Sequence, residues 1–191
     1  SAMVGREIDE VFPKSEHIPA EPRLVIESLS ADKFQDVSLT IRRNEIVGIA
    51  GLVGSGREDL IDTIYGLKAP RSGTIKIDGV RQKFRAPADA VAAGIALVPR
   101  DRRHDGLVLD MSVSDNINLA ALDAVSRGTL ENRVAANAVA TEMSETLDIR
   151  PRNVAATTRL LSGGNQQKVV LGRWLNKGAD VFILDEPTVG V

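Results

Sequence analysis

The chain has 191 residues, of which 43% are hydrophobic, 3% are aromatic and none is cysteine, and its formal net charge is −2 at pH 7. This length fits one domain with a core of Leu, Ile, Val and Ala, and the lack of cysteine excludes a disulfide scaffold and a thiolate metal site. The slight acidic surplus argues against nucleic acid as the main partner, and no apolar run approaches the ~20 residues that span a bilayer, so we expect a soluble chain that reaches a membrane only through a partner.

The first part of the chain predicts a linker followed by β-structure. Residues 1–22 have no clear period and carry several prolines and charges, and the first two look like the remains of an expression tag. We therefore place the domain at residues 23–191. Leu24–Ile26 is a short apolar run, and residues 37–41 alternate apolar and polar side chains, as a half-buried strand does.

The following elements alternate between strands and helices, which predicts an α/β core. Apolar spacing at Leu60, Ile61 and Ile64 indicates a helix that Gly66 ends. The other elements expected up to residue 98 are a buried strand at 45–50, a strand at 74–77 with a tight turn at 78–79, a short helix at 87–93 and a strand at 95–98.

The second half predicts a block of helices before one last strand. Residues 99–106 read as a charged loop. We expect a helix through 116–122 capped by Ser112 or Ser114, a helix from about 130 to 147 with Leu130, Val134, Val139, Met143 and Leu147 on one stripe, a helix at 165–176 and a strand at 181–184. Because the block at about 112–176 lacks strands, it predicts a helical subdomain inserted into the α/β core.

A glycine-rich loop between the strand at 45–50 and the next helix fits both glycines of the phosphate-loop pattern G-x-x-x-x-G-K-[ST]. Its backbone N–H groups can surround phosphate oxygens, and the following helix N-terminus favours an anion. By itself the loop could equally be a glycine-rich turn without a ligand. The candidate nucleotide-binding residues are Gly51, Leu52, Val53, Gly54, Ser55, Gly56, Arg57 and Glu58.

Two residues of this loop depart from the pattern. Arg57 replaces the lysine that reaches the outer phosphates, which keeps the charge on a bulkier, planar group. Glu58 replaces the hydroxyl that binds Mg²⁺. Its carboxylate should repel a triphosphate, and it could instead bind Mg²⁺ directly or fold over and fill the empty anion site.

Two further segments carry chemistry. Ser162, Gly163 and Gly164 open a helix, where a hydroxyl and free N–H groups can point at a phosphate. Asp185 and Glu186 follow an apolar strand, where the first can hold Mg²⁺ and the second can act as a general base towards water. Each segment alone could be a capped loop or a solvated turn, but their combination favours catalysis.

This combination resembles the ATP-binding cassette (ABC) ATPases, and in particular the second nucleotide-binding domain of tandem ATP-binding subunits of ribose-, galactose-, arabinose- and xylose-type sugar importers. The resemblance covers nearly the whole chain. It is carried by Met3–Glu7, Gly51–Arg57, Val98–Arg103 with Asp105–Leu107, Leu161–Lys168 and Val181–Thr188. We call Leu161–Lys168 the signature segment.

The resemblance implies a P-loop ABC core with an antiparallel β element and an inserted helical subdomain. It implies that two cassettes of one polypeptide close head to tail around two ATP molecules with Mg²⁺ held by Asp185. Ser162–Gln166, including Asn165, would then complete the site of the first cassette, while Gly51–Glu58 forms a weaker one. Arg100 would face transmembrane permease subunits that receive sugar from a binding protein, with the cassette peripheral on the cytoplasmic face of the plasma membrane.

Several features depart from the family pattern. Arg100 stands where Gln or Glu is expected, no aromatic residue precedes Phe34 to stack on adenine, and the D-loop and switch histidine would lie beyond Val191, where His17 and His104 cannot substitute. We therefore expect an ATPase that powers monosaccharide uptake as a full-length protein and little hydrolysis by this chain alone. The alternatives are a docking cassette with weak or no nucleotide binding, and a non-transport ABC protein of DNA repair or translation.

Overall fold

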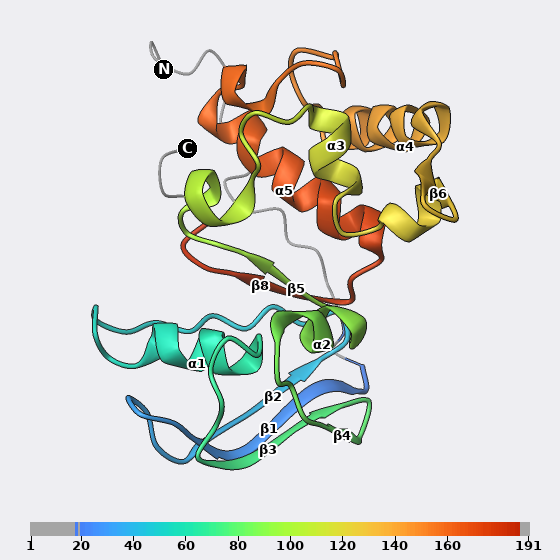
Figure 1. The fold of residues 1–191 in the computed structure, drawn as a ribbon. Coiled ribbons are helices and arrows are strands. Elements are labelled where there is room, and N and C mark those ends of the chain that lie inside the picture. The colour runs from blue at the N-terminus through green and yellow to red at the C-terminus, as the bar shows by residue number, and fades with distance from the viewer. Residues whose placement is uncertain (1–17, 19, 188–191) are drawn as a thin grey trace.

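The computed structural model describes residue 18 and residues 20–187, which form a four-stranded antiparallel sheet, a two-stranded parallel sheet and a group of helices (Figure 1). Within this part of the chain, no helix is both long and apolar enough to cross a bilayer. The predictions for the linker up to residue 17, including Met3–Glu7 and His17, and for Thr188–Val191 lie outside the described residues.

The antiparallel sheet has the strand order β2-β1-β3-β4. Register places Leu24 opposite both Ile41 and Ile77, and Ile26 opposite both Leu39 and Ile75, so the apolar side chains of three strands share one face. The alternation predicted for residues 37–41 is confirmed by their burial. The strands are β1 (Pro22–Ser30), β2 (Val37–Arg42), β3 (Ser72–Ile77) and β4 (Val80–Gln82).

Helix α1 (Arg57–Ile64) packs its apolar stripe into the same core as this sheet, with Leu60 and Ile64 buried. Glu58 and Asp59 lie in its first turn, where the helix dipole favours carboxylates. The helix ends at Gly66, whose φ of 78° is in the left-handed region, as predicted for a terminating glycine.

The parallel pair β5 (Ile95–Val98) and β8 (Val181–Leu184) separates two hydrophobic cores. In β5, Ile95 belongs to the core of the antiparallel sheet, while Ala96 and Val98 belong to the core of the helices. Strand alternation thus lets one strand serve both sides, and Figure 1 shows the pair lying between them. The short helix α2 (Pro87–Ala92) leads into β5.

The helical part is built on α3 (Val113–Asn118), α4 (Arg133–Thr146) and α5 (Gly163–Lys177), which contact one another (Figure 1). One prediction for this block is wrong, since it contains a short hairpin. Its remaining elements are a π-helical turn η1 (Arg102–Gly106), 3-10 turns η2 (Leu122–Val125) and η3 (Thr158–Leu160), and the hairpin strands β6 (Ser126–Arg127) and β7 (Leu130–Glu131).

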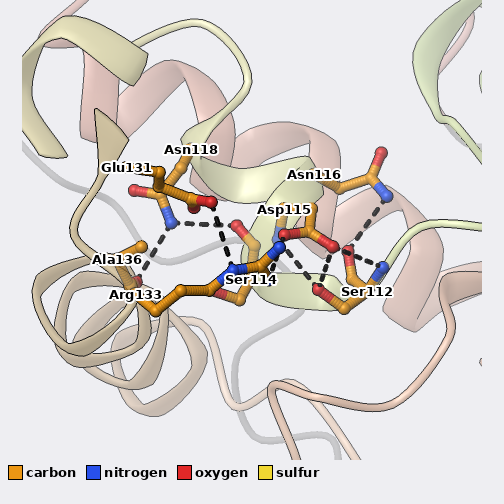
Figure 2. Close-up of polar contacts among 8 residues, drawn as sticks. All are labelled: Ser112, Ser114, Asp115, Asn116, Asn118, Glu131, Arg133 and Ala136. Carbon is orange, nitrogen blue, oxygen red and sulfur yellow. Dashed lines mark hydrogen bonds and ion pairs between the residues drawn. The ribbon is translucent and has the colours of Figure 1, made fainter. Parts of the chain in front are cut away.

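Polar side chains fix the ends of α3 (Figure 2). Ser112 caps the helix by accepting a hydrogen bond from the Asp115 N–H at 3.0 Å, and Asp115 in turn accepts one from the Ser112 N–H at 3.2 Å. At the other end, the buried Asn118 amide donates to the Ala136 carbonyl of α4 at 3.0 Å. The predicted cap at Ser112 is therefore confirmed, but the helix ends at Asn118, before the predicted end at residue 122.

The predicted stripe of α4 is confirmed only in part, because Met143 and Leu147 pack against the helical core but Leu130 and Val134 are exposed. Asn132 caps this helix, so Leu130 lies outside it in β7, and Val134 is 81% exposed. The buried residues are instead Ala136, Ala140 and Ser144, spaced at four. Their small side chains allow α3 and α4 to lie close together.

The buried strand predicted at 45–50 does not form. These residues have no regular secondary structure, and Ile46 is 95% exposed. A cavity of about 750 Å³ lies between residues 41–47 and β8. A strand forms only beside another strand that supplies hydrogen bonds. Among the described residues, β8 pairs only with β5, and the cavity separates its other edge from residues 45–50, so this segment has no strand to pair with.

Candidate functional site

The glycine-rich loop Gly51–Gly56, which we call the glycine loop, leads directly into α1. Gly51–Ser55 are exposed, and the Ser55 N–H donates to the Leu52 carbonyl at 3.0 Å. Gly56 is the N-cap of α1 with φ 92°, and a Cβ there would lie 2.3 Å from the Lys33 carbonyl oxygen. Only glycine fits this position, so the turn that aims α1 at the loop is set by a close approach to Lys33.

Arg57, the first residue of α1, turns its side chain towards the end of β8. Its guanidinium donates a hydrogen bond to the Glu186 carboxylate and lies 3.6 Å from Glu58. The hydrogen bond to Glu186 raises the pKa of Arg57 further above its ordinary value. The Nε of Arg57 is buried and has no hydrogen-bond partner. Such an orphan donor, beside a glycine loop and a helix N-terminus, fits an anion.

The two carboxylates after β8 have opposite environments. The hydrogen bond from Arg57 lowers the pKa of Glu186, and the charge of Arg100 adds to this effect. Burial raises the pKa of Asp185, against the opposing charges of Arg100 and Arg57. Glu186 is thus ionised and hydrogen-bonded to Arg57, whereas Asp185 has only the longer ion pair with Arg100.

Arg100 reaches both carboxylates from the chain after β5. Its Nε lies 3.9 Å from an oxygen of Asp185, and its Nη1 lies 3.9 Å from one of Glu186, so these are ion pairs rather than hydrogen bonds. The adjacent charged loop forms η1, capped by Asp101. Together Arg57 and Arg100 place two cations against Glu58, Asp185 and Glu186.

The signature segment lies at the start of α5. Ser162 is an exposed N-cap that accepts hydrogen bonds from the backbone and the side chain of Asn165. The N–H groups of Gly163 and Gly164 belong to the first turn, which has no intrahelical acceptors, and so they are open to an anion. Gln166 is 2% exposed, and its amide donates to the Thr158 carbonyl at 3.1 Å.

The structure brings some of the predicted site residues together and leaves others apart. Arg57, Glu58, Arg100, Asp185 and Glu186 form one cluster. No hydrogen bond or ion pair within residues 20–187 joins the signature segment to the glycine loop. The signature helix does contact the carboxylates' loop, because the Gln167 amide donates to the Pro187 carbonyl.

A cavity of about 610 Å³ opens beside the cluster, between α1 and α5. Its lining joins Glu58, Arg100 and Asp185 to Arg173 and Trp174 of α5. Sequence reasoning missed Arg173, which is 8% exposed and hydrogen-bonds Asn116. Burial lowers its pKa to about 10. Its position between apolar residues of the helix was the sequence signal that could have predicted a buried arginine here.

The described residues contain no preformed metal site around Asp185, the residue predicted to hold Mg²⁺. Among the described residues, no three His, Asp or Glu side chains converge as a metal site. Asp185 would therefore supply one or two ligands, with the remaining positions filled by water and phosphate oxygens, which is how Mg²⁺ usually binds.

Comparison with known proteins identifies the family and the fold. The profile of the ABC transporter family matches residues 34–189. An ATP-binding cassette of an ABC transporter, MJ1267, superposes with a TM-score of 0.74 at 20% identity over 90% of this chain and 72% of that one. CbiO1 from Clostridium perfringens, part of the ABC transporter complex cbiONQ, gives 0.72 at 22% identity over 90% and 68%.

Curated relatives are more similar in sequence. A ribose import ATP-binding protein, RbsA 1, of Streptomyces coelicolor is 44% identical over 99% of this chain and 38% of its own length. RbsA of Chromobacterium violaceum is 42% identical over the same shares. The chain thus spans little more than a third of the relatives it matches. Its fold is the P-loop ABC cassette with an antiparallel element and helical part, as expected.

Proposed function

The chain belongs to the ABC transporter family, and from this premise we propose that it is the second ATP-binding cassette of a tandem sugar-import ATPase. In this proposal, ATP binding and hydrolysis by the whole protein drive the uptake of a monosaccharide of the ribose type. The names of the relatives support the substrate class. The altered glycine loop and the intact signature segment support the position as the second cassette.

The glycine loop and Arg57 would hold the phosphates of the nucleotide. The buried, unpartnered Nε of Arg57 and the first-turn N–H groups of α1 are donors without protein acceptors, which supports an anion at this place. Asp185 would hold Mg²⁺, and Glu58, which lines the same cavity, would offer a further oxygen ligand. A bound Mg²⁺ would neutralise phosphate charge that these carboxylates otherwise repel.

The observation that carries the proposal is the pairing of Glu186. A general base must accept a proton from water, and it does so poorly when its pKa is depressed. The hydrogen bond from Arg57 and the charge of Arg100 lower the pKa of Glu186. A phosphate held by Arg57 would weaken the first contact but leave Arg100 3.9 Å from Glu186, so this carboxylate would stay a poor base in the loaded site. We therefore infer that the site of this cassette binds nucleotide but turns it over slowly or not at all.

The signature segment would act in the other site. Within the described residues, its exposed Ser162 and the open N–H groups of Gly163 and Gly164 form no hydrogen bond or ion pair with the glycine loop, which supports donation to the first cassette of the same polypeptide. Asn165, which orients Ser162 through a 2.9 Å hydrogen bond, and Gln166, which anchors the helix, would position this anion site.

The remaining partners follow from the same proposal. The cassette would lie on the cytoplasmic face of the plasma membrane against permease subunits, with the region of Arg100 towards them, and a sugar-binding protein would deliver the substrate. This chain alone, without the first cassette, is expected to hydrolyse ATP negligibly.

Steady-state ATPase assays of the full-length protein test the division of labour between the two sites. Gly163→Asp should abolish most of the activity, because a side chain and a charge would enter the donated anion site. The double change Arg57→Ala and Glu58→Ala should leave most of it. Equal losses in both variants would refute the assignment, and turnover by the pure chain that depends on Arg57 would refute its predicted inactivity.

The Arg57–Glu186 pair also favours a second candidate, a docking cassette whose anion site is filled by its own carboxylate. Calorimetric titration of Mg-ATP into the chain separates the two. A Kd tighter than about 1 μM, or −8 kcal/mol, excludes the docking cassette, and absence of binding in the millimolar range excludes the nucleotide site.

A further inference from the structure

The backbone of Glu186 adopts a conformation that the local sequence disfavours. Its φ is 47°, in the left-handed region, where a residue with a long side chain is uncommon. Pro187 adds to the cost, because a residue that precedes proline prefers an extended backbone. The other non-glycine residues with positive φ in the described part of the chain are short and polar, as turns favour: Ser28, Asp36, Asn44, Asp78 and Asp148.

Three contacts hold this turn, and a strained backbone conformation persists only where such contacts exist. Before the turn, the Asp185 N–H donates to the carbonyl of the last residue of β5 at 3.0 Å. The side chain of Glu186 is held by Arg57. After it, Pro187 has no N–H to donate, and its carbonyl accepts a hydrogen bond from the Gln167 amide. Within the described residues, no other hydrogen bond reaches the backbone of Glu186 or Pro187, so Gln167 fixes the end of the turn.

Helix α5 gives Gln167 a fixed base. Gln167, Val170 and Trp174 are spaced at three and four residues, so they lie on one face of the helix. On this face Val170 is fully buried in the helical core, and the Trp174 Nε1 donates to the Leu97 carbonyl of β5 at 2.8 Å. Figure 1 shows α5 above β5 and β8. The helix is therefore anchored on β5, and Gln167 reaches the turn from a rigid support.

The preceding glutamine has a different task. Gln166 points into the helical part, where it is 2% exposed and donates to the Thr158 carbonyl at 3.1 Å. Gln167 is half-buried and points to the loop that carries the carboxylates. Of these two adjacent amides, one thus anchors the helix and the other contacts the candidate site.

We propose that Gln167 is a positioning residue for Glu186. By holding the Pro187 carbonyl, its amide keeps Glu186 in the left-handed conformation in which the carboxylate meets Arg57. Loss of this hydrogen bond would let Glu186 relax towards an extended backbone, which carries its side chain away from Arg57. This geometric role requires only the chain itself.

The consequence for nucleotide binding rests on the proposed function. In that site Arg57 would hold a phosphate, and its hydrogen bond to Glu186 competes with the phosphate. Because Gln167 maintains the pair, it lowers the affinity of the site. A variant of Gln167 that releases Glu186 would therefore bind nucleotide more tightly than the parent, which is the opposite of what damage to the fold causes.

Nuclear magnetic resonance of the chain without nucleotide tests the geometric role. A residue with positive φ holds its amide proton close to its own Hα, so it gives a strong NOE between these two protons. Gln167→Met has a side chain of similar length without the N–H donors, and it should weaken the NOE of Glu186. Asp78, which also has φ 47°, should keep its strong NOE in the same spectrum. Gln35→Met, the same change at an exposed position, is the control and should leave both NOEs unchanged.

Gln167→Ala removes the same donor without a new side chain to pack, so it provides a second variant and should weaken the same NOE. The positioning role is overturned if Glu186 keeps its strong NOE in both variants. It is also overturned if the NOE of Asp78 weakens equally, since a general loosening of the fold affects both residues.

Calorimetric titration of ADP tests the consequence. Gln167→Met should lower the Kd roughly twofold to tenfold, because one charge-assisted hydrogen bond no longer competes. In the Glu186→Gln background the same change should alter the Kd little, since the competing charge is already gone. An equal effect in the two backgrounds would show that Gln167 does not act through Glu186 and would overturn the proposal. A weakened NOE without any binding of ADP supports the positioning role and refutes the proposed nucleotide site, so the two inferences fail separately.

Discussion

Replacing Gly56 by alanine should destabilise the domain through the turn that aims α1 at the glycine loop. The residue has φ 92°, which costs an L-amino acid about 1–2 kcal/mol. The added Cβ would also lie 2.3 Å from the Lys33 carbonyl oxygen and 3.2 Å from the Phe34 Cβ. Because backbone rather than a flexible side chain must move, overpacking adds about 1–3 kcal/mol.

Gly54→Ala is the matched control for this effect. Gly54 has φ 82°, in the same region, but an added Cβ there would have no heavy atom within 4 Å apart from its chain neighbours. It should therefore lose only the conformational share, about 1–2 kcal/mol, while Gly56→Ala loses about 2–5 kcal/mol in total. Urea unfolding followed by circular dichroism measures both free energies of unfolding. Equal losses at the two positions would show that the close approach to Lys33 does not constrain the glycine loop.

Three further changes test the site and its support. Arg57→Gln should raise the pKa of Glu186 in a carboxyl NMR titration, and an unchanged pKa would contradict the pairing. The stabilisation of the fold by this pair is present above the ordinary glutamate pKa and is lost as the pH falls through the depressed pKa of Glu186. Ser112→Ala should cost about 1 kcal/mol of unfolding free energy through the lost cap, with Ser126→Ala as control. Trp174→Phe should cost more, about 1–3 kcal/mol in urea unfolding, because it removes both the hydrogen bond from Nε1 to the Leu97 carbonyl at 2.8 Å and part of a buried ring.

Local sequence patterns predicted correctly those elements that depend on one buried face or on one turn. The alternation at residues 37–41, the run at 95–98 and the terminating Gly66 each reflect one face or one turn, and the structure confirms them. The long helix lies close to its predicted bounds, but part of its stripe was assigned wrongly because Leu130 and Val134 fit the helical period by chance. The fully buried residues of this helix are Ala136, Ala140 and Ser144, which a search for a stripe of large apolar residues does not find.

Contacts between distant residues could not be predicted in this way. The strand expected at 45–50 has the right composition, but a strand forms only with a partner, and composition does not reveal whether one is present. The pairing of Arg57 with Glu186 joins residues 129 positions apart, so neither motif contains it. The sequence revealed the glycine loop and the carboxylate pair, but only the fold shows that Arg57 of the first neutralises Glu186 of the second.

This neutralisation has a consequence for nucleotide affinity. In the proposed site, Arg57 can hold a phosphate only by weakening its hydrogen bond to Glu186, so binding exchanges one charge-assisted pair for another and gains only their difference. Glu186→Gln removes the competing charge and should tighten binding of ADP, which is not hydrolysed and so separates affinity from turnover. Calorimetry would record a lower Kd for this variant, and Glu142→Gln, the same change at an exposed position of α4, serves as control. An unchanged Kd in Glu186→Gln would mean that the Arg57 pair does not limit affinity, and a higher Kd would mean that Glu186 aids nucleotide binding, as a metal ligand does.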